Sequence, residues 1–168
     1  MNNKIEIANS QPNLNQITQK IIGETCNQVT FSYGDELLLD FGEMSAYNHP
    51  KLRHLSKGTW QLSTRSTPVY LKKVHPMFFS SYFKNPMYPT TKRKLRLLEN
   101  KKLTDFVIDT NKNFQLTLSF EGNYRLVLKP DLEDDSGLAY WELMMPNEQI
   151  LTVGPGMFWE CKSIHERY

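Results

Sequence analysis

The sequence predicts a mainly antiparallel β protein with one or two short helices. In several short segments apolar residues alternate with polar ones, which is typical of strands that bury one face. Gly, Asn and Pro separate these segments at short intervals, as expected for turns. The 168 residues predict a single domain, 1–168, because a chain of this length can bury roughly 70% of its unfolded surface.

The first expected element is a short helix that begins after Asn13. Asn13 suits the N-cap position, and the glutamine three positions later approximates a capping box. Leu14, Ile17 and Ile21 recur at helical spacing, and Gly23 suits the end of the helix. A helix this short is stable only when it packs against other elements. We therefore expect it to lie on the sheet.

Two hairpins are expected in the first half of the chain. The first joins residues 29–33 to 37–41 through Gly34-Asp35, a pair that suits a two-residue turn. The second joins residues 59–64 to 69–74. The polar stretch between the two hairpins is expected to be a loop.

The second half of the chain repeats this plan. Residues 114–120 and 124–128 alternate around a turn at Gly122, and residues 140–144 and 149–153 form a further hairpin. Residues 103–108 are expected to add a strand before them. Two hairpin–loop–hairpin units of this kind would pack as an antiparallel sandwich or a half-open barrel.

The similarity of the two halves predicts an internal repeat of residues 26–79 and 103–160, joined by an aromatic and basic connector over 80–102. Trp60-Gln61-Leu62 lines up with Trp141-Glu142-Leu143. Chance similarity between alternating strands is the alternative. The matched Trp60 and Trp141 could line a shared pocket, but a place in the common core is favoured because Trp contributes a large apolar area.

An aromatic segment over residues 76–88 predicts an interface. If exposed, its rings would form an apolar patch larger than monomers usually tolerate. We therefore expect a homodimer, formed through these rings or through the pairing of strand edges. The aromatic residues are Phe78, Phe79, Tyr82, Phe83 and Tyr88.

A basic run follows, with Lys92, Arg93, Lys94 and Arg96. Together with the aromatic residues before it, the run could bind single-stranded nucleic acid through stacking and phosphate contacts. The net charge of the chain is only +2, which favours a solvated connector instead. We expect a short helix here and no nucleic-acid partner.

Neither a metal site nor a cofactor site is expected. The acidic loop 131–137 lacks the spacing of a calcium-binding loop. Cys26, Cys161 and His165 could meet around zinc only without a paired Cys-x-x-Cys motif. The sequence contains no nucleophile elbow, zinc-protease motif or Gly-rich phosphate loop, so no catalytic residue is assigned.

The expected location is the cytoplasm. The first 20 residues contain no apolar run of the length that a signal peptide needs. No stretch approaches the roughly 20 apolar residues of a membrane span. The two cysteines, Cys26 and Cys161, are therefore expected to be reduced thiols, and a disulfide between them is the alternative.

Two runs in the first half resemble a signature of an uncharacterised family of small bacterial proteins, some of them cyanobacterial. They are Tyr-Gly-Asp-Glu-Leu-Leu-Leu-Asp-Phe-Gly at residues 33–42 and Gly-Thr-Trp-Gln-Leu-Ser-Thr-Arg at residues 58–65. The resemblance covers roughly residues 20–75. It implies no activity, because none is known for that group.

The expected function is that of a non-enzymatic binding protein that acts through protein–protein contacts with an unknown partner. One alternative is a small-ligand or nucleotide-binding protein, or even an enzyme, with a pocket between the two repeats. Another is nucleic-acid binding through residues 92–96. The candidate binding residues are Trp60, Trp141, Phe78, Phe79, Tyr82, Tyr88, Lys92, Arg93, Lys94 and Arg96.

Overall fold

The computed structural model describes residues 13–32, 36–65, 67–74, 92–156 and 158–166. Its strands are β1 (Thr25–Phe31), β2 (Leu37–Phe41), β3 (Ser45–Ala46), β4 (Ser56–Lys57), β5 (Trp60–Thr64), β6 (Val69–Lys73), β7 (Lys101–Asp109), β8 (Gln115–Phe120), β9 (Tyr124–Leu128), β10 (Trp141–Met144), β11 (Gln149–Val153) and β12 (Trp159–Ser163). Its helices are α1 (Leu14–Ile17) and α2 (Lys92–Leu95), and its 3₁₀ turns are η1 (Gln19–Ile21), η2 (Pro50–Leu52), η4 (Arg96–Leu98), η5 (Thr110–Lys112) and η6 (Ile164–Glu166).

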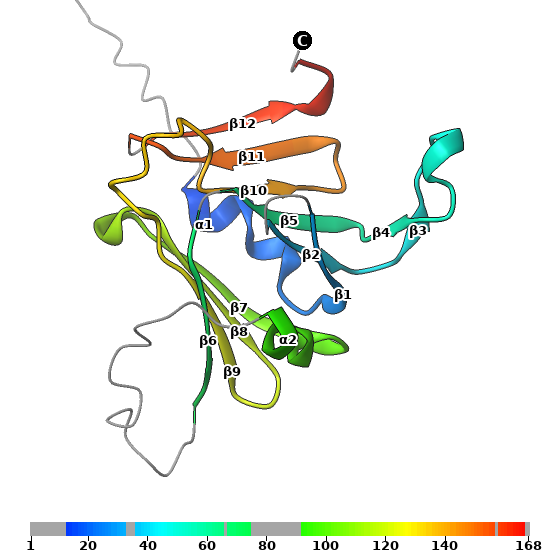
Figure 1. Cartoon of the computed structure of the whole chain (residues 1–168), viewed down its shortest axis with the longest axis horizontal. Helices are drawn as coiled ribbons and strands as arrows, with labels where there is room; N and C mark the ends of the chain where they lie inside the picture. The colour runs from blue at the N-terminus through cyan, green and yellow to red at the C-terminus, as the bar shows by residue number, and fades with distance from the viewer. Residues whose placement is uncertain (1–12, 33–35, 66, 75–91, 157, 167–168) are drawn as a thin grey trace, which may run out of the picture.

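Ten strands form one antiparallel sheet in the order β12-β11-β10-β5-β2-β1-β7-β8-β9-β6. The sheet ends at β12 on one side and at β6 on the other, so it is not closed into a barrel. β3 and β4 form a separate pair that projects from the sheet (Figure 1). The mainly β class with short helices is thereby confirmed.

β1 joins the two parts of the sheet. It pairs with β2 along most of its length but with β7 only at Thr25 and Cys26. Beyond this short contact the strands β7, β8, β9 and β6 run in a different direction from β5, β10, β11 and β12 (Figure 1). The two parts therefore enclose the core between them, as the layers of a sandwich do.

Three of the four expected hairpins are confirmed. β1 pairs with β2, β8 with β9 and β10 with β11, all antiparallel. The hairpin expected from residues 59–64 and 69–74 is wrong, although both strands form. β5 lies between β2 and β10, whereas β6 pairs with β9.

Hydrogen bonds after β5 explain this difference. The Arg65 amide and the Thr67 hydroxyl both donate to the Tyr140 carbonyl, at 3.2 and 2.7 Å. Farther on, the Lys129 amide donates to the Pro68 carbonyl at 3.1 Å. These contacts lead the chain away from β5, both edges of which are already paired, and toward the free edge of β9.

The two Trp-x-Leu segments face each other in neighbouring strands. Leu62 of β5 lies directly opposite Leu143 of β10, so a local two-fold axis passes between them. In the sheet, β2 and β11 lie on either side of this pair of strands. The repeat of 26–79 and 103–160 stays a prediction from the sequence.

Aromatic contacts tie the two parts of the sheet together. The rings of Phe41 on β2 and Phe120 on β8 stack with their centroids 6.2 Å apart. Trp141 on β10 meets the Phe106 ring of β7 edge-on at 6.1 Å and donates its indole N–H to the Phe114 carbonyl at 3.4 Å. Trp141 has no exposed surface. Its expected place in the core is therefore confirmed.

The expected N-terminal helix is present as α1 followed by η1. The Asn13 side chain accepts a hydrogen bond from the Asn15 amide at 3.1 Å, which caps the first turn. The Asn15 side chain accepts from the Ile108 amide and donates to the Ile108 carbonyl, as a neighbouring strand would. Ile21 is fully buried. Packing against β7 thus stabilises a helix too short to persist alone (Figure 1).

The basic run forms the expected short helix, α2 and η4. Leu95 and Leu98 are buried beneath it, while Lys92, Arg93 and Lys94 are exposed.

Two features of the fold were not predicted from the sequence. β12 extends the sheet at its edge, and β3 and β4 form within the stretch expected to be a loop.

Replacing Trp141 by Ala should lower the free energy of unfolding by about 3–5 kcal/mol, because it empties a fully buried site and leaves the Phe114 carbonyl without its donor. Urea unfolding followed by circular dichroism measures this loss. Leu132→Ala is the control, because 60% of Leu132 is exposed, and it should change stability by less than about 0.5 kcal/mol. Equal losses in the two variants would contradict the core position of Trp141.

Candidate functional site

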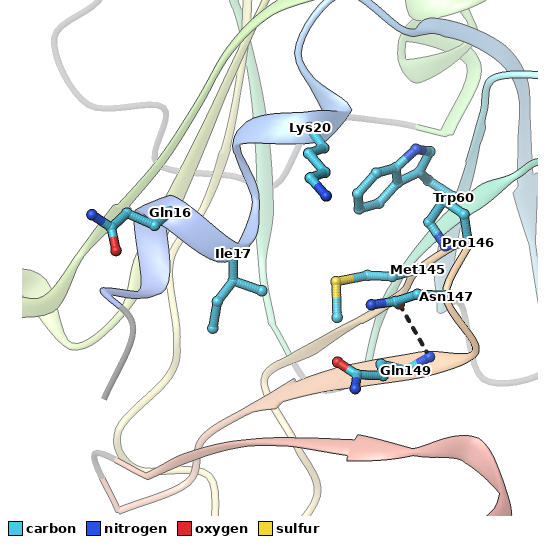
Figure 2. A pocket seen from close by; sticks show the side chains of 8 residues that line it. All are labelled: Gln16, Ile17, Lys20, Trp60, Met145, Pro146, Asn147 and Gln149. Atoms are coloured by element: carbon cyan, nitrogen blue, oxygen red, sulfur yellow. Dashed lines mark hydrogen bonds between the residues drawn. The ribbon is translucent and has the colours of Figure 1, made fainter. Parts of the chain in front are cut away.

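A pocket of about 390 Å³ lies where α1 and η1 approach the beginning of β5 and the turn between β10 and β11 (Figure 2). Its volume is within the usual range for small-molecule sites, roughly 300–1,000 Å³. The lining residues are Gln16, Ile17, Lys20, Trp60, Met145, Pro146, Asn147 and Gln149. They come from segments far apart in the sequence.

The turn that supplies half of the lining follows from its residue types. Pro146 takes the second position of the turn, and Asn147 follows it. Glu148 then adopts a φ of 59°, in the left-handed region. Met145 and Gln149 close the turn with a backbone hydrogen bond of 2.9 Å. A turn followed by a left-handed residue is a common three-residue hairpin loop, and it presents Asn147 to the pocket.

The wall of the pocket is apolar. Trp60 and Met145 are only 5% and 6% exposed, so their side chains are packed in the core and show one side to the pocket. Ile17 is half-buried and packs against the same core. Figure 2 shows the Met145 side chain directed toward the helix that carries Ile17. These three side chains supply the apolar part of the pocket lining.

Hydrogen-bond donors gather around this apolar wall. The Asn147 side-chain oxygen accepts from the Gln149 amide at 3.3 Å, and the Gln149 side-chain oxygen accepts from the Cys161 thiol at 3.3 Å. Each of these oxygens accepts one hydrogen bond within the protein, and each side chain also carries an NH₂ group that can donate. Lys20 adds an ammonium group that points toward the Trp60 ring (Figure 2). Among the described residues that line the pocket, Lys20 alone carries a charge.

A smaller hollow of about 180 Å³ lies on the opposite face of β5. Here the Arg65 guanidinium bridges Glu36 and Glu142, with N–O distances of 3.3 Å to both. Partial burial opposes the charge of Arg65, but the two carboxylates raise its pKa. Glu142 also accepts a hydrogen bond from the Thr152 hydroxyl at 3.4 Å. Because its charges are compensated within the protein, this hollow is the weaker candidate for a ligand site.

Asp40 is a buried acid, with only 1% of its surface exposed. Burial raises the pKa of its carboxyl group, while hydrogen bonds from the Gly58 amide and the Gln61 side chain, at 2.8 and 3.0 Å, partly offset the shift. Gly58 has to be a glycine, since a Cβ there would lie 2.6 Å from the Phe41 backbone. Asp40 therefore joins β2 to the beginning of β5 and is closed to any substrate.

The two cysteines do not meet. Cys26 lies on β1 and Cys161 on β12, with four strands of the sheet between them, and both are free thiols. Burial raises the pKa of Cys26 to about 12. In the described part of the chain, no three His, Cys, Asp or Glu side chains are grouped so that they could hold a metal ion. No helix there is long and apolar enough to cross a bilayer.

The structure brings one predicted site residue to the pocket, Trp60. Trp141 lies in the core away from the pocket, and the basic residues Lys92, Arg93, Lys94 and Arg96 lie on α2 and η4, where the Lys92 ammonium sits over the Phe31 ring at 5.1 Å. Phe78, Phe79, Tyr82 and Tyr88 lie outside the described residues.

Sequence reasoning missed Lys20, Asn147 and Gln149. The turn chemistry around Pro146 could have identified the loop, but nothing in the sequence says that it lies against the N-terminal helix. That contact depends on β10 pairing with β5, which no local pattern predicts.

Comparisons with protein-family models, curated proteins and solved structures find no match to this chain. The resemblance to small bacterial proteins therefore stays a prediction.

Replacing Asp40 by Asn should make stability less dependent on pH. Because burial raises the pKa of Asp40 in the folded state, its contribution to stability is present below the unfolded pKa of 3.8 and is lost as the pH rises through the folded pKa. Asn keeps the acceptor oxygen but does not titrate. The stability of the variant relative to wild type should thus increase as the pH is raised from about 3 to 7.

Urea unfolding across this pH range measures the difference. Asp135→Asn, at an exposed position, is the control and should show no such increase. A difference between Asp40→Asn and wild type that stays constant or falls with pH would contradict the burial of Asp40.

Proposed function

We propose that the protein is a non-enzymatic binding protein that holds a small ligand with an apolar body and an anionic group, such as an aromatic or branched carboxylate. The pocket beside Trp60 is the observation that supports this proposal. It combines an apolar wall with polar groups that can donate hydrogen bonds, and ligand sites usually have this composition.

The apolar body of the ligand would lie against Trp60, Met145 and Ile17. The first two side chains are held by the core and need no rearrangement to receive it. A preformed wall lowers the entropy cost of binding, because few side chains have to be ordered. The partly exposed Ile17 would lose its remaining contact with water.

The anionic group would lie at the rim. Lys20, Asn147 and Gln149 offer donors there, and the acceptor oxygen of each amide already accepts one hydrogen bond within the protein. A carboxylate supplies acceptors only, so it complements such a rim better than a hydroxyl or an ammonium group. The charge of Lys20 favours the same choice.

Naphthalene-2-carboxylate and the uncharged 2-naphthalenemethanol test this proposal, because the two probes share an aromatic body. Isothermal titration calorimetry should show that the carboxylate binds about 3- to 10-fold more tightly, as expected for one partly exposed charged contact. Lys20→Gln should remove this difference and leave the affinity for the alcohol unchanged.

Two further variants complete the experiment. Lys51→Gln removes a charge from η2, outside the pocket lining, and should leave both affinities unchanged. Ile17→Phe narrows the pocket and should weaken the binding of both probes. The proposal is wrong if the wild-type protein binds neither probe or binds both equally well.

A further inference from the structure

The edge strand β12 is suited to pair with a second copy of itself. On one side β12 pairs with β11 in a regular antiparallel register, with Cys161 opposite Leu151. On its other side no strand of the described chain is paired with it. Edge strands present unpaired backbone groups and are natural sites for the addition of another strand.

The backbone groups that face outward can be assigned. The Gly154 amide donates to the Phe158 carbonyl at 2.6 Å, and the Ile164 amide donates to the Glu148 carbonyl at 2.9 Å. Hydrogen bonding alternates along an antiparallel pair, so Phe158, Glu160, Lys162 and Ile164 bond toward β11. The N–H and C=O groups of Trp159, Cys161 and Ser163 therefore point away from the sheet.

These outward groups are symmetric about Cys161. In an antiparallel pair of two β12 strands centred on Cys161, Trp159 of one copy lies opposite Ser163 of the other, and every outward backbone group gains a partner. The same register places Glu160 opposite Lys162 at both ends. Opposite charges in this arrangement stabilise a strand pair.

Charge distinguishes β12 from the other edge of the sheet. Glu160 and Lys162 already form an ion pair of 2.6 Å within β12, so this strand carries no net charge on that face. At the other edge β6 carries Lys72 and Lys73. Partial burial lowers the pKa of Lys72, as do the nearby side chains of Lys129 and Arg125, so several basic side chains are gathered at this edge. Positive charge thus protects β6 from self-pairing, whereas β12 lacks this protection.

We propose that the chain forms a homodimer through antiparallel pairing of β12 with β12 of a second copy, centred on Cys161, so that one sheet continues across both copies. The exposed Phe158 and the half-buried Trp159 lie at the end of this strand and would add apolar contact. The proposal does not rest on a bound ligand, although Cys161 also donates a hydrogen bond to Gln149 at the rim of the pocket. It assigns the expected dimer to a strand edge and does not involve the aromatic segment 76–88.

Charge exchange tests the pairing and its register. Wild-type protein in light scattering should give twice the chain mass of 19.7 kDa. Glu160→Lys and Lys162→Glu each place like charges opposite one another and should weaken the dimer by about ten- to a hundredfold. A mixture of these two variants should restore the dimer as a heterodimer, because the opposed charges are again opposite in sign.

Circular dichroism and thermal unfolding establish that each variant is folded. Lys72→Glu on β6 is the control variant and should leave the dimer intact.

Chemical cross-linking is a further test of the register. Diamide, which takes up the two electrons and two protons of the thiols, should link Cys161 to Cys161 in wild type, because Cα atoms in a hydrogen-bonded pair are about 5.5 Å apart. Cys26 is fully buried and should not react.

A wild-type chain that stays monomeric at its highest soluble concentration would overturn the proposal. So would a dimer that both charge variants leave unchanged and that diamide does not link through Cys161. Rescue in the mixture of variants would support it, because a general loss of stability in either variant could not produce rescue.

Discussion

The pairing of β5 with β10 is the constraint on which the rest of the structure depends. It places the fully buried Leu143 opposite Leu62 and joins β10, β11 and β12 to the strands of the first half. Because β5 then has no free edge, β6 has to pair elsewhere and extends the sheet beyond β9. The same register sets Gln61 opposite Met144, so Trp60 lies beside the turn that follows β10. The pocket is a direct result of this alignment.

Local patterns predicted the strands and three of the four hairpins, but not the pairings between segments far apart in the sequence. Residues 59–64 and 69–74 alternate as strands do, and both form strands, yet they do not form the hairpin that their closeness in sequence suggests. A hairpin is predicted reliably when its turn is short and has the right residues, as between β8 and β9. The segment between β5 and β6 is instead held by Tyr140, a contact that no local pattern reveals.

The candidate site was less predictable than the fold. Trp60 was singled out for its similarity to Trp141, and this match led to a pocket residue only because β5 and β10 are neighbours. In the sequence, nothing distinguishes Lys20 from other lysines that lie on the polar face of a helix. Its significance depends on the helix lying over the beginning of β5, and this arrangement depends on long-range contacts such as that between Asn15 and Ile108. When the residues of a site come from distant segments, the spacing of residues along the sequence does not reveal the site.

The interleaving of the two halves also determines how the chain can acquire its structure during synthesis. When β5 leaves the ribosome, its partner β10 has not yet been synthesised. The same holds for β6 and its partner β9. The first 74 residues alone would therefore leave β5 and β6 each with an edge that pairs only later. Pairings between such distant segments slow folding, because the loops between them have to close first. The N-terminal half should consequently need the C-terminal strands, or a chaperone in their place, to stay out of aggregates.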